Sequence, residues 1–309
     1  MKSFFQAIVL LLLSSCSTDR SIIDRHSDKS DIEKHLMVIT KTEGFRNYQN
    51  SKVLNFVADY IYKHFEKYCD TVYYQTYTVN GVEYKNVVGS IGPKNSERII
   101  VGAHYDVCGE QEGADDNASG VVGLLELAQL LKGRELKYRI DFVAYSLEEP
   151  PFFRTHFMGS YVHAKSLNDA KVRVKGMICL EMIGYFSDKP KSQEYPLPHK
   201  TLIYGDKANY IMIVEKMGNN GFADDVKGLM KNAEFLDTKS IKAPSIVTGI
   251  DFSDHRNYWE FGYSALMITN TSFYRKANYH EPTDKLETLD LNRMASVIDE
   301  VYFALMNLE

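Results

Sequence analysis

Apolar residues recur at helical spacing in two segments near the start of the chain. The longer segment runs from Ser51 to Tyr68 and the shorter from about Ser30 to Thr42. Two strand-like segments follow, Thr71–Val79 and Val82–Ile91, and the turn pair Asn80-Gly81 joins them. Because an Asn-Gly pair favours the tight turn of a hairpin, the pattern predicts two amphipathic helices followed by a β-hairpin.

From residue 98 onward, apolar strands alternate with helical segments. We expect strands at about residues 98–105, 138–146, 174–183, 201–204 and 263–269. We expect helices at about residues 118–131 and 159–167, around 211–230, and at 290–308. No internal repeat and no Pro/Gly-rich break follows residue 30. The sequence therefore predicts one α/β domain over residues 31–309, with three α/β/α layers around a mixed, mostly parallel sheet.

The composition fits a globular domain. Of 309 residues, 44% are hydrophobic and 25% charged, with 8 Pro and 19 Gly, which excludes disordered, collagen-like and multi-span membrane proteins. Lys and Arg total 36 against 41 Asp and Glu, for a net charge of −5. No basic surface for nucleic acid is indicated, and we expect no nucleic-acid partner.

The first residues have the pattern of an export signal. The apolar run Phe4–Leu13 is shorter than the roughly 20 residues that a membrane span requires. It ends in Leu13-Ser14-Ser15-Cys16, which resembles a bacterial lipobox, where the Cys becomes the lipidated first residue of the mature chain. The alternative is an ordinary cleaved signal with an incidental Cys16.

On the lipobox interpretation, residues 1–15 form a lipoprotein signal peptide, and residues 16–30 form the lipidated Cys16 and a polar tether. We then expect the protein in the bacterial cell envelope, anchored to the membrane through Cys16. Ser17 after the Cys favours the outer membrane under one common sorting rule, facing the periplasm or the exterior.

Side chains that bind metals follow three of the predicted strands. His104 ends the first, Glu148 and Glu149 follow the second, and Glu181 follows the third. The acidic segment Asp115-Asp116-Asn117 opens the apolar helix. Because ligands bind beyond the carboxyl ends of strands in open α/β sheets, we expect these side chains to gather at one edge.

Such a cluster of carboxylates repels itself unless a cation compensates, and the mixture of imidazole nitrogen and carboxylate oxygen suits zinc. Each motif alone has an ordinary alternative: His104 as a hydrogen-bonded strand-end residue, or Asp115, Asp116 and Asn117 as caps of the following helix. Three converging strand ends favour the metal.

Read in order, the motifs resemble those of the co-catalytic zinc aminopeptidases of clan MH, a superfamily that also includes the glutaminyl cyclases. The motifs are His104-Tyr-Asp, residues 113–120 (Gly-Ala-Asp-Asp-Asn-Ala-Ser-Gly), Glu148-Glu149, Glu181-Met-Ile-Gly-Tyr, Ser253-Asp254-His255 and Tyr279-His280. The resemblance extends from about residue 31 to residue 309. It implies a zinc exopeptidase that hydrolyses N-terminal residues of peptides with a free amino end.

The resemblance also implies a ligand set for one or two zinc ions. Asp116 matches the carboxylate that bridges two metals. His104 and Glu181 match ligands of one metal, and Glu149 and His280 match ligands of the other.

Further roles follow from the same resemblance. Glu148 matches the general base that takes a proton from the metal-activated water, and Tyr279 either stabilises the oxyanion or is a packed aromatic residue. Asp106 lies two residues after His104 and is expected to orient its imidazole. Asp254 and His255 are expected to support the ligands from behind.

Three positions depart from the usual motifs or have no assigned role. The family most often has Asp where this chain has Glu181, which leaves one or two zinc ions possible. After Glu149, the segment from Pro150 to Thr155 either walls a pocket with Phe152, Phe153 and Arg154 or packs in the core. The implied ligand set needs no thiolate, so we expect Cys108 to be a loop cysteine near the edge of the site.

Three function hypotheses stay open. The first is a zinc aminopeptidase, a hydrolase and metallopeptidase acting in proteolysis. The second is a glutaminyl cyclase-like acyltransferase with a single zinc, which similar ligand motifs also permit. The third is a non-catalytic lipoprotein stabilised by metal, against which Glu148 beside Glu149 counts, since a structural metal has no use for a spare base.

Overall fold

The computed structural model describes residues 23–309, apart from residues 197, 219, 220, 276 and 277. The expected signal peptide and Cys16 lie outside the described residues. Among the described residues, none of the helices has both the length and the apolar character needed to cross a membrane.

Eight strands form one mixed sheet in the order β1-β2-β4-β3-β5-β8-β6-β7. The strands are β1 (Thr71–Val79), β2 (Val82–Ile91), β3 (Arg98–His104), β4 (Arg139–Tyr145), β5 (Val174–Glu181), β6 (Ile211–Lys216), β7 (Thr238–Ala243) and β8 (Ala265–Thr269). The central strands β4, β3, β5 and β8 are parallel, as are β6 and β7. The pairs β1–β2, β2–β4 and β6–β8 are antiparallel. The predicted mixed α/β sheet is confirmed.

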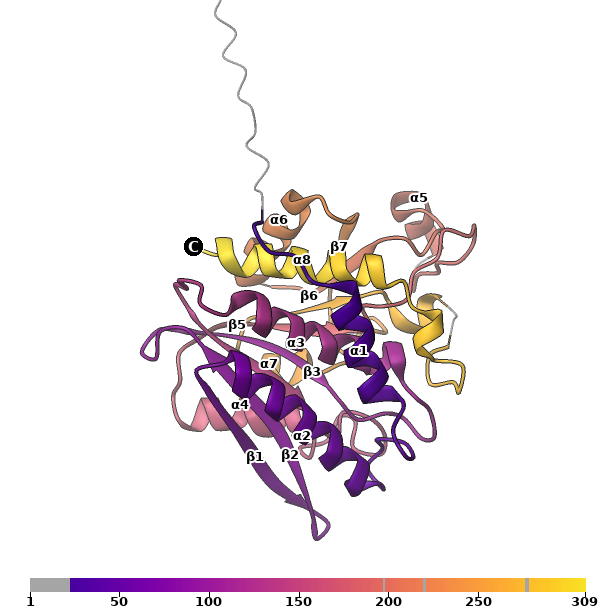
Figure 1. Cartoon of the computed structure of the whole chain (residues 1–309). Helices are drawn as coiled ribbons and strands as arrows, with labels where there is room; N and C mark the ends of the chain where they lie inside the picture. Colours follow the sequence, from indigo (N-terminus) through magenta and orange to yellow (C-terminus); the bar gives the residue numbers. More distant parts are fainter. Residues whose placement is uncertain (1–22, 197, 219–220, 276–277) are drawn as a thin grey trace, which may run out of the picture.

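Helices cover both faces of the sheet, giving the predicted three layers (Figure 1). The helices are α1 (Lys29–Thr40), α2 (Ser51–Tyr68), α3 (Gly120–Leu131), α4 (Gly159–Asp169), α5 (Thr201–Tyr204), α6 (Gly221–Ala233), α7 (His255–Glu260) and α8 (Leu291–Asn307). Residues of α1, α2, α3, α6 and α8 share one apolar core. Residues of α4 and α7 pack into a second core on the opposite face.

The hairpin and α2 form where the sequence predicts them. Asn80 and Gly81 both have positive φ angles, 50° and 83°, which is the conformation of the favoured hairpin turn. Helix α2 begins after Asn50, whose side chain accepts a hydrogen bond from the backbone N–H of Val53.

Two predicted elements are wrong. Residues 201–204 form the single helical turn α5 rather than a strand, and Leu202 at its centre is 90% exposed. Residues 211–216 form the buried strand β6 rather than the start of a helix. Pairing with β8 and β7 decides the structure there, because an apolar run of this length suits either element. Strand β7 and helix α7 were not predicted.

Part of the segment expected to be a tether lies on the domain. The Arg25 guanidinium donates hydrogen bonds to the carbonyl oxygens of Leu130 and Lys132, at the C-terminal end of α3. The backbone N–H and hydroxyl of Ser27 both donate to Asp299 on α8. Residues 25–28 are therefore held against the helical layer.

Candidate metal centre

The ends of three parallel strands bring the predicted ligands together. His104 is the last residue of β3 and Glu181 the last of β5, while the turn after β4 carries Glu148 and Glu149. His104 Nε2 lies 3.4 Å from Glu181 Oε2 and 3.8 Å from Glu148 Oε2. The strand ends thus bring side chains that are far apart in the sequence into one cluster, as predicted.

Asp116 lies between two histidines. Its Oδ1 atom is 3.4 Å from His104 Nε2, and its Oδ2 atom is 3.3 Å from His280 Nε2. Glu149 Oε2 is 3.2 Å from the same His280 nitrogen. Each carboxylate oxygen of Asp116 therefore faces a different imidazole, which is the arrangement of a bridging carboxylate.

Buried hydrogen bonds hold Asp116 in this position. The backbone N–H groups of Asp115 and Asp116 donate to the two carboxylate oxygens of Asp284, both at 2.9 Å. The Asp115 carboxylate accepts from Gly184 N and from Asn270 Nδ2, which ties the turn to the segments after β5 and β8.

Two further groups orient the other ligands. Asp106 accepts hydrogen bonds from the backbone N–H groups of Glu148 and Glu149, at 3.1 Å each, and its Oδ1 lies 3.6 Å from His104 Nδ1. The Ser253 hydroxyl donates to Glu181 Oε2 at 2.6 Å. One carboxylate thus fixes the β4 turn relative to His104, and one hydroxyl fixes the longer Glu181 side chain.

The electrostatics of the cluster favour positive charge. Burial alone would lower the pKa of His280, but hydrogen bonds to Asp116 and Glu149 raise it to about 11. Burial would raise the pKa of Asp116, but hydrogen bonds from His104 and His280 hold it below its usual range. Burial raises the pKa of Glu149 to about 7 and that of Glu148 well above its usual value.

The donor set fits zinc. Two ligand atoms that each lie about 2.0–2.1 Å from a tetrahedral zinc ion are about 3.3 Å apart. Nitrogen–oxygen spacings of 3.2–3.4 Å join His280 to Glu149 and Asp116, and His104 to Asp116 and Glu181. The residues that would hold the metal are therefore His104, Asp116, Glu149, Glu181 and His280.

A cavity of about 150 Å³ opens beside these ligands. Glu148 lines it together with an apolar wall that includes Phe153, Ile250, Phe252 and Met267. The cavity therefore joins the cluster of carboxylates to an apolar surface.

The segment after Glu149 divides between the two roles considered for it. Phe153 lines the cavity, whereas Phe152 is buried in the core against Tyr48. Arg154 lies over the Phe153 ring and pairs with Asp251 at 2.6 Å.

The remaining predicted residues, Tyr279, Asp254 and His255, differ in their contacts with the site. Tyr279 lines the cavity, and its ring stacks on His280 with centroids 3.9 Å apart. Asp254 is fully buried, and burial raises its pKa to about 7 against the attraction of His104. His255 is not brought to the ligands by any contact that the described residues show: its Nε2 lies 2.7 Å from Ile250 O and its ring against Trp259.

Sequence reasoning missed Asp284 and Arg46. Asp284 follows no strand, and only the folded chain brings it to the backbone of Asp116. Arg46 is 1% exposed and donates to the carbonyl oxygens of Tyr105 and Gly113. The one signal for Asp284 in the sequence is its position, four residues after the predicted ligand His280.

The family follows from comparison with known proteins. The model of peptidase family M28 matches residues 86–304, and the chain belongs to this family. Uncharacterized protein YfbL of Escherichia coli (strain K12) is 42% identical over 291 residues, covering 92% of this chain and 89% of that protein. Leucine aminopeptidase 1 of Pyrenophora tritici-repentis (strain Pt-1C-BFP) is 28% identical over 225 residues, covering 68% of this chain. The match spans about half (51%) of that aminopeptidase's length.

Solved structures share the fold. The LapA aminopeptidase of Legionella pneumophila superposes with a TM-score of 0.71 at 20% identity, covering 91% of this chain and 73% of that one. The glutaminyl cyclase of Fimbriiglobus ruber superposes with a TM-score of 0.72 at 18% identity, covering 91% and 96%. The match to the M28 family model confirms the predicted superfamily, and family membership supports a peptidase.

Proposed function

We propose that this protein is a zinc aminopeptidase that removes N-terminal residues from peptides with a free amino end. The observation that carries the proposal is the position of Asp116, whose two oxygens face His104 and His280 at 3.4 and 3.3 Å. Glu181 lies beside His104 on one side of Asp116, and Glu149 lies beside His280 on the other. A purely structural metal site would not need the buried base Glu148 at the wall of a cavity.

Zinc bound by these residues would polarise the scissile carbonyl and acidify a water molecule. Glu148 takes a proton from the attacking water and returns it to the leaving amine, for which a raised carboxyl pKa is suited. The Asp106 carboxylate holds the Glu148 backbone in place by accepting a hydrogen bond from the Glu148 N–H group. In this proposal Tyr279, which lines the same cavity, donates a hydrogen bond from its hydroxyl to the developing oxyanion.

The cavity supports a preference for apolar N-terminal side chains. Phe153, Ile250, Phe252 and Met267 offer an apolar wall, and the carboxylates beside it offer partners for the cationic amine of the substrate. We expect peptides that begin with Leu or Phe to be cleaved with a kcat/KM at least about tenfold above that of peptides beginning with Asp.

We further propose that the protein is an exported lipoprotein of the bacterial cell envelope, anchored in the outer membrane through Cys16. The support is the lipobox-like string that ends at Cys16. Metabolic labelling with a fatty-acid analogue in a bacterial host should mark the chain and fail to mark the Cys16→Ser variant. Equal labelling of both chains would exclude this anchor.

The activity is tested on the domain of residues 23–309 with added zinc. The substrates are peptides with a free amino end, one of which begins with Gln. Release of free amino acids, together with bound zinc measured by elemental analysis, is the expected result. Loss of ammonia from the Gln peptide without release of any residue would assign the chain to the glutaminyl cyclases instead. Bound zinc without either product would leave only a metal-stabilised binding protein.

A further inference from the structure

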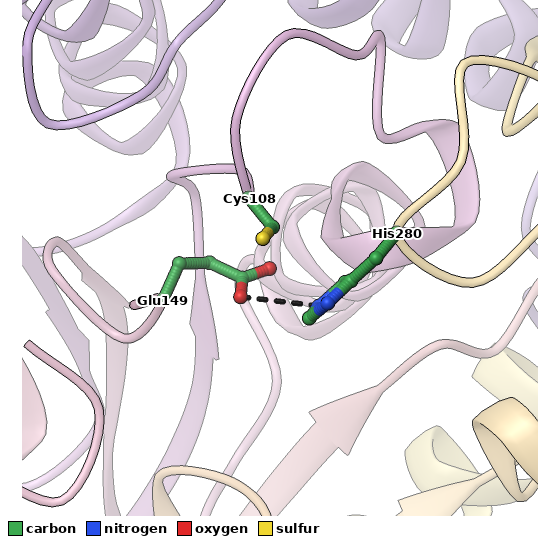
Figure 2. A group of neighbouring side chains, drawn as sticks. All are labelled: Cys108, Glu149 and His280. Carbon is green, nitrogen blue, oxygen red and sulfur yellow. Dashed lines mark ion pairs between the residues drawn. The ribbon is translucent and has the colours of Figure 1, made fainter. Parts of the chain in front are cut away.

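A thiol lies beside one side of the candidate metal centre. The sulfur of Cys108, an oxygen of Glu149 and a nitrogen of His280 all lie within 4.8 Å of one another. Figure 2 shows the Cys108 side chain directed toward the Glu149 carboxylate, with the His280 ring beside both. These three residues come from three separate segments: the loops after β3 and β4, and the segment after β8.

The backbone around Cys108 is firmly held. Buried Arg46 donates to the carbonyl oxygens of Tyr105 and Gly113 at the two ends of the loop, at 2.8 and 2.5 Å. Within the loop, Asn47 Nδ2 donates to Gly109 O at 2.7 Å, and Val107 N donates to Arg46 O at 3.2 Å. The residues on both sides of Cys108 are therefore held against the segment of Arg46 and Asn47.

Cys108 differs from the other cysteines that the structure describes. Cys69 and Cys179 are buried within the strand and helix layers, whereas Cys108 is half-buried. No disulfide joins these three described cysteines. Of these three described cysteines, only Cys108 thus combines access from solvent with a position beside carboxylate and imidazole donors.

We propose that Cys108 is a thiolate ligand of the metal that Glu149 and His280 bind, an inference that rests on the metal centre of the proposed function. Ligand atoms of a tetrahedral zinc site that includes sulfur are about 3.6 Å apart. The three atoms lie within 4.8 Å of one another, so they need to approach by at most about 1 Å, which is within the range of a side-chain rotation. On binding, the thiol proton passes to solvent and the sulfur–metal bond takes its place.

The ligand makes the two sides of the centre chemically unequal. His104 and Glu181 offer nitrogen and oxygen alone, whereas Cys108, Glu149 and His280 offer sulfur, oxygen and nitrogen. Because thiolate favours soft metal ions, this side binds Cd²⁺ and Zn²⁺ in preference to harder ions such as Mn²⁺.

Spectroscopy of the metal-bound protein tests the inference independently of activity. The domain of residues 23–309 is titrated with Co²⁺ and with Cd²⁺, and the ultraviolet thiolate-to-metal band of each ion is recorded. We expect the band in the wild-type protein, its loss in Cys108→Ser, and Cd²⁺ affinity at least about tenfold weaker in that variant. Glu148→Gln is the matched control, since it alters the neighbouring carboxylate but keeps every proposed ligand, and it should retain the band.

Alkylation of the unmodified sequence provides a second measurement that needs no variant. We expect iodoacetamide to label Cys108, identified by peptide mass mapping, and zinc to slow this labelling at least about tenfold.

Bound metal without the band, or with Cys108 still labelled at the metal-free rate, would overturn the thiolate ligand and leave the aminopeptidase untouched. Failure to bind any metal would overturn both proposals. Circular dichroism of Cys108→Ser establishes that a lost band does not come from a lost fold.

Discussion

At the scale of single residues, Glu148 lies among the ligands without being needed as one. The proposed mechanism gives it the proton-transfer step, so Glu148→Gln should keep zinc but lose kcat by about 10²–10⁴-fold. The amide is nearly the same size and cannot accept the proton. Peptide release and metal content, measured on the same sample, check both halves of this expectation.

The matched comparison is His280→Ala, which removes a ligand and should lose metal as well as turnover. A Glu148→Gln enzyme with full activity would show that another group moves the proton.

Ser253 carries a second expectation at this scale. Its hydroxyl is the 2.6 Å donor to Glu181, where the resemblance to the zinc aminopeptidases leads us to expect Asp. Ser253→Ala frees the longer side chain and should weaken zinc binding by about tenfold, since partners that orient ligands contribute this much. Competition with a chromogenic chelator measures the affinity.

Ser296→Ala on α8 is the control for Ser253→Ala, because it removes a hydroxyl that donates to the carbonyl oxygen of Asn292 within its own helix. Unchanged zinc affinity in both variants would show that Glu181 is held by other contacts.

Part of the candidate site was predictable because strand ends are visible in sequence, whereas Asp116 and His280 were assigned through the resemblance to a known family. His104, Glu148 and Glu181 each follow an apolar run, and parallel strands place such residues at one edge. Asp284 and Arg46 were not predictable, because they reach the site through loops whose course depends on the assembled fold.

At the scale of elements, close packing on β3 positions His104. Gly102 lies two residues before it, and a Cβ atom there would meet the Tyr145 ring at 2.4 Å. That ring cannot move aside easily, because it is fully buried and its hydroxyl lies 2.7 Å from that of Tyr258. Gly102→Ala should therefore lower the free energy of unfolding by about 1–3 kcal/mol, measured by chemical denaturation.

Gly228→Ala on α6 is the matched control. A Cβ atom at Gly228 meets nothing within 4 Å, so this change should raise stability by about 0.5–1 kcal/mol through helix propensity. Equal effects of the two substitutions would contradict the packing argument at Gly102.

Elements were predictable where local sequence and tertiary structure agree. Helix α2 has both its helical period and the Asn50 cap, and β1–β2 has its Asn-Gly turn. Strand β7 escaped prediction because its sequence, Thr-Lys-Ser-Ile-Lys-Ala, is polar and it lies at the edge of the sheet. Helix α7 has only six residues, too few to show a period.

At the scale of the whole molecule, Glu126 links folding to pH. It lies on α3 and is 1% exposed, with Oε1 3.6 Å from His35 Nε2 and Oε2 accepting a 3.4 Å hydrogen bond from Asp28 N. Burial raises its pKa from 4.5 to about 7, with smaller contributions from Asp31, Asp28 and Asp299 against the Asp28 hydrogen bond. Between pH 4.5 and about 7, the folded protein therefore holds a proton on Glu126 that the unfolded chain has already released.

The sign of the effect follows from this difference in proton binding. Below pH 4.5 the carboxyl group is neutral in both states and imposes no penalty. Between pH 4.5 and about 7 the unfolded chain binds fewer protons, so stability falls as pH rises. Glu126→Gln abolishes this loss, and we expect the variant to gain on the wild-type protein with rising pH, up to about 3 kcal/mol near pH 7.

Urea denaturation of both proteins at pH 4.5, 6 and 7.5 measures the difference directly. Burial lowers the pKa of neighbouring His35 to about 4, so this imidazole is mostly neutral over the pH range of the comparison. A difference in stability that does not change between pH 4.5 and 7.5 would mean that Glu126 ionises in the folded state as readily as in the unfolded chain. The stability contributed by the contacts of Glu126 with Asp28 and His35 would then not depend on the charge of Glu126.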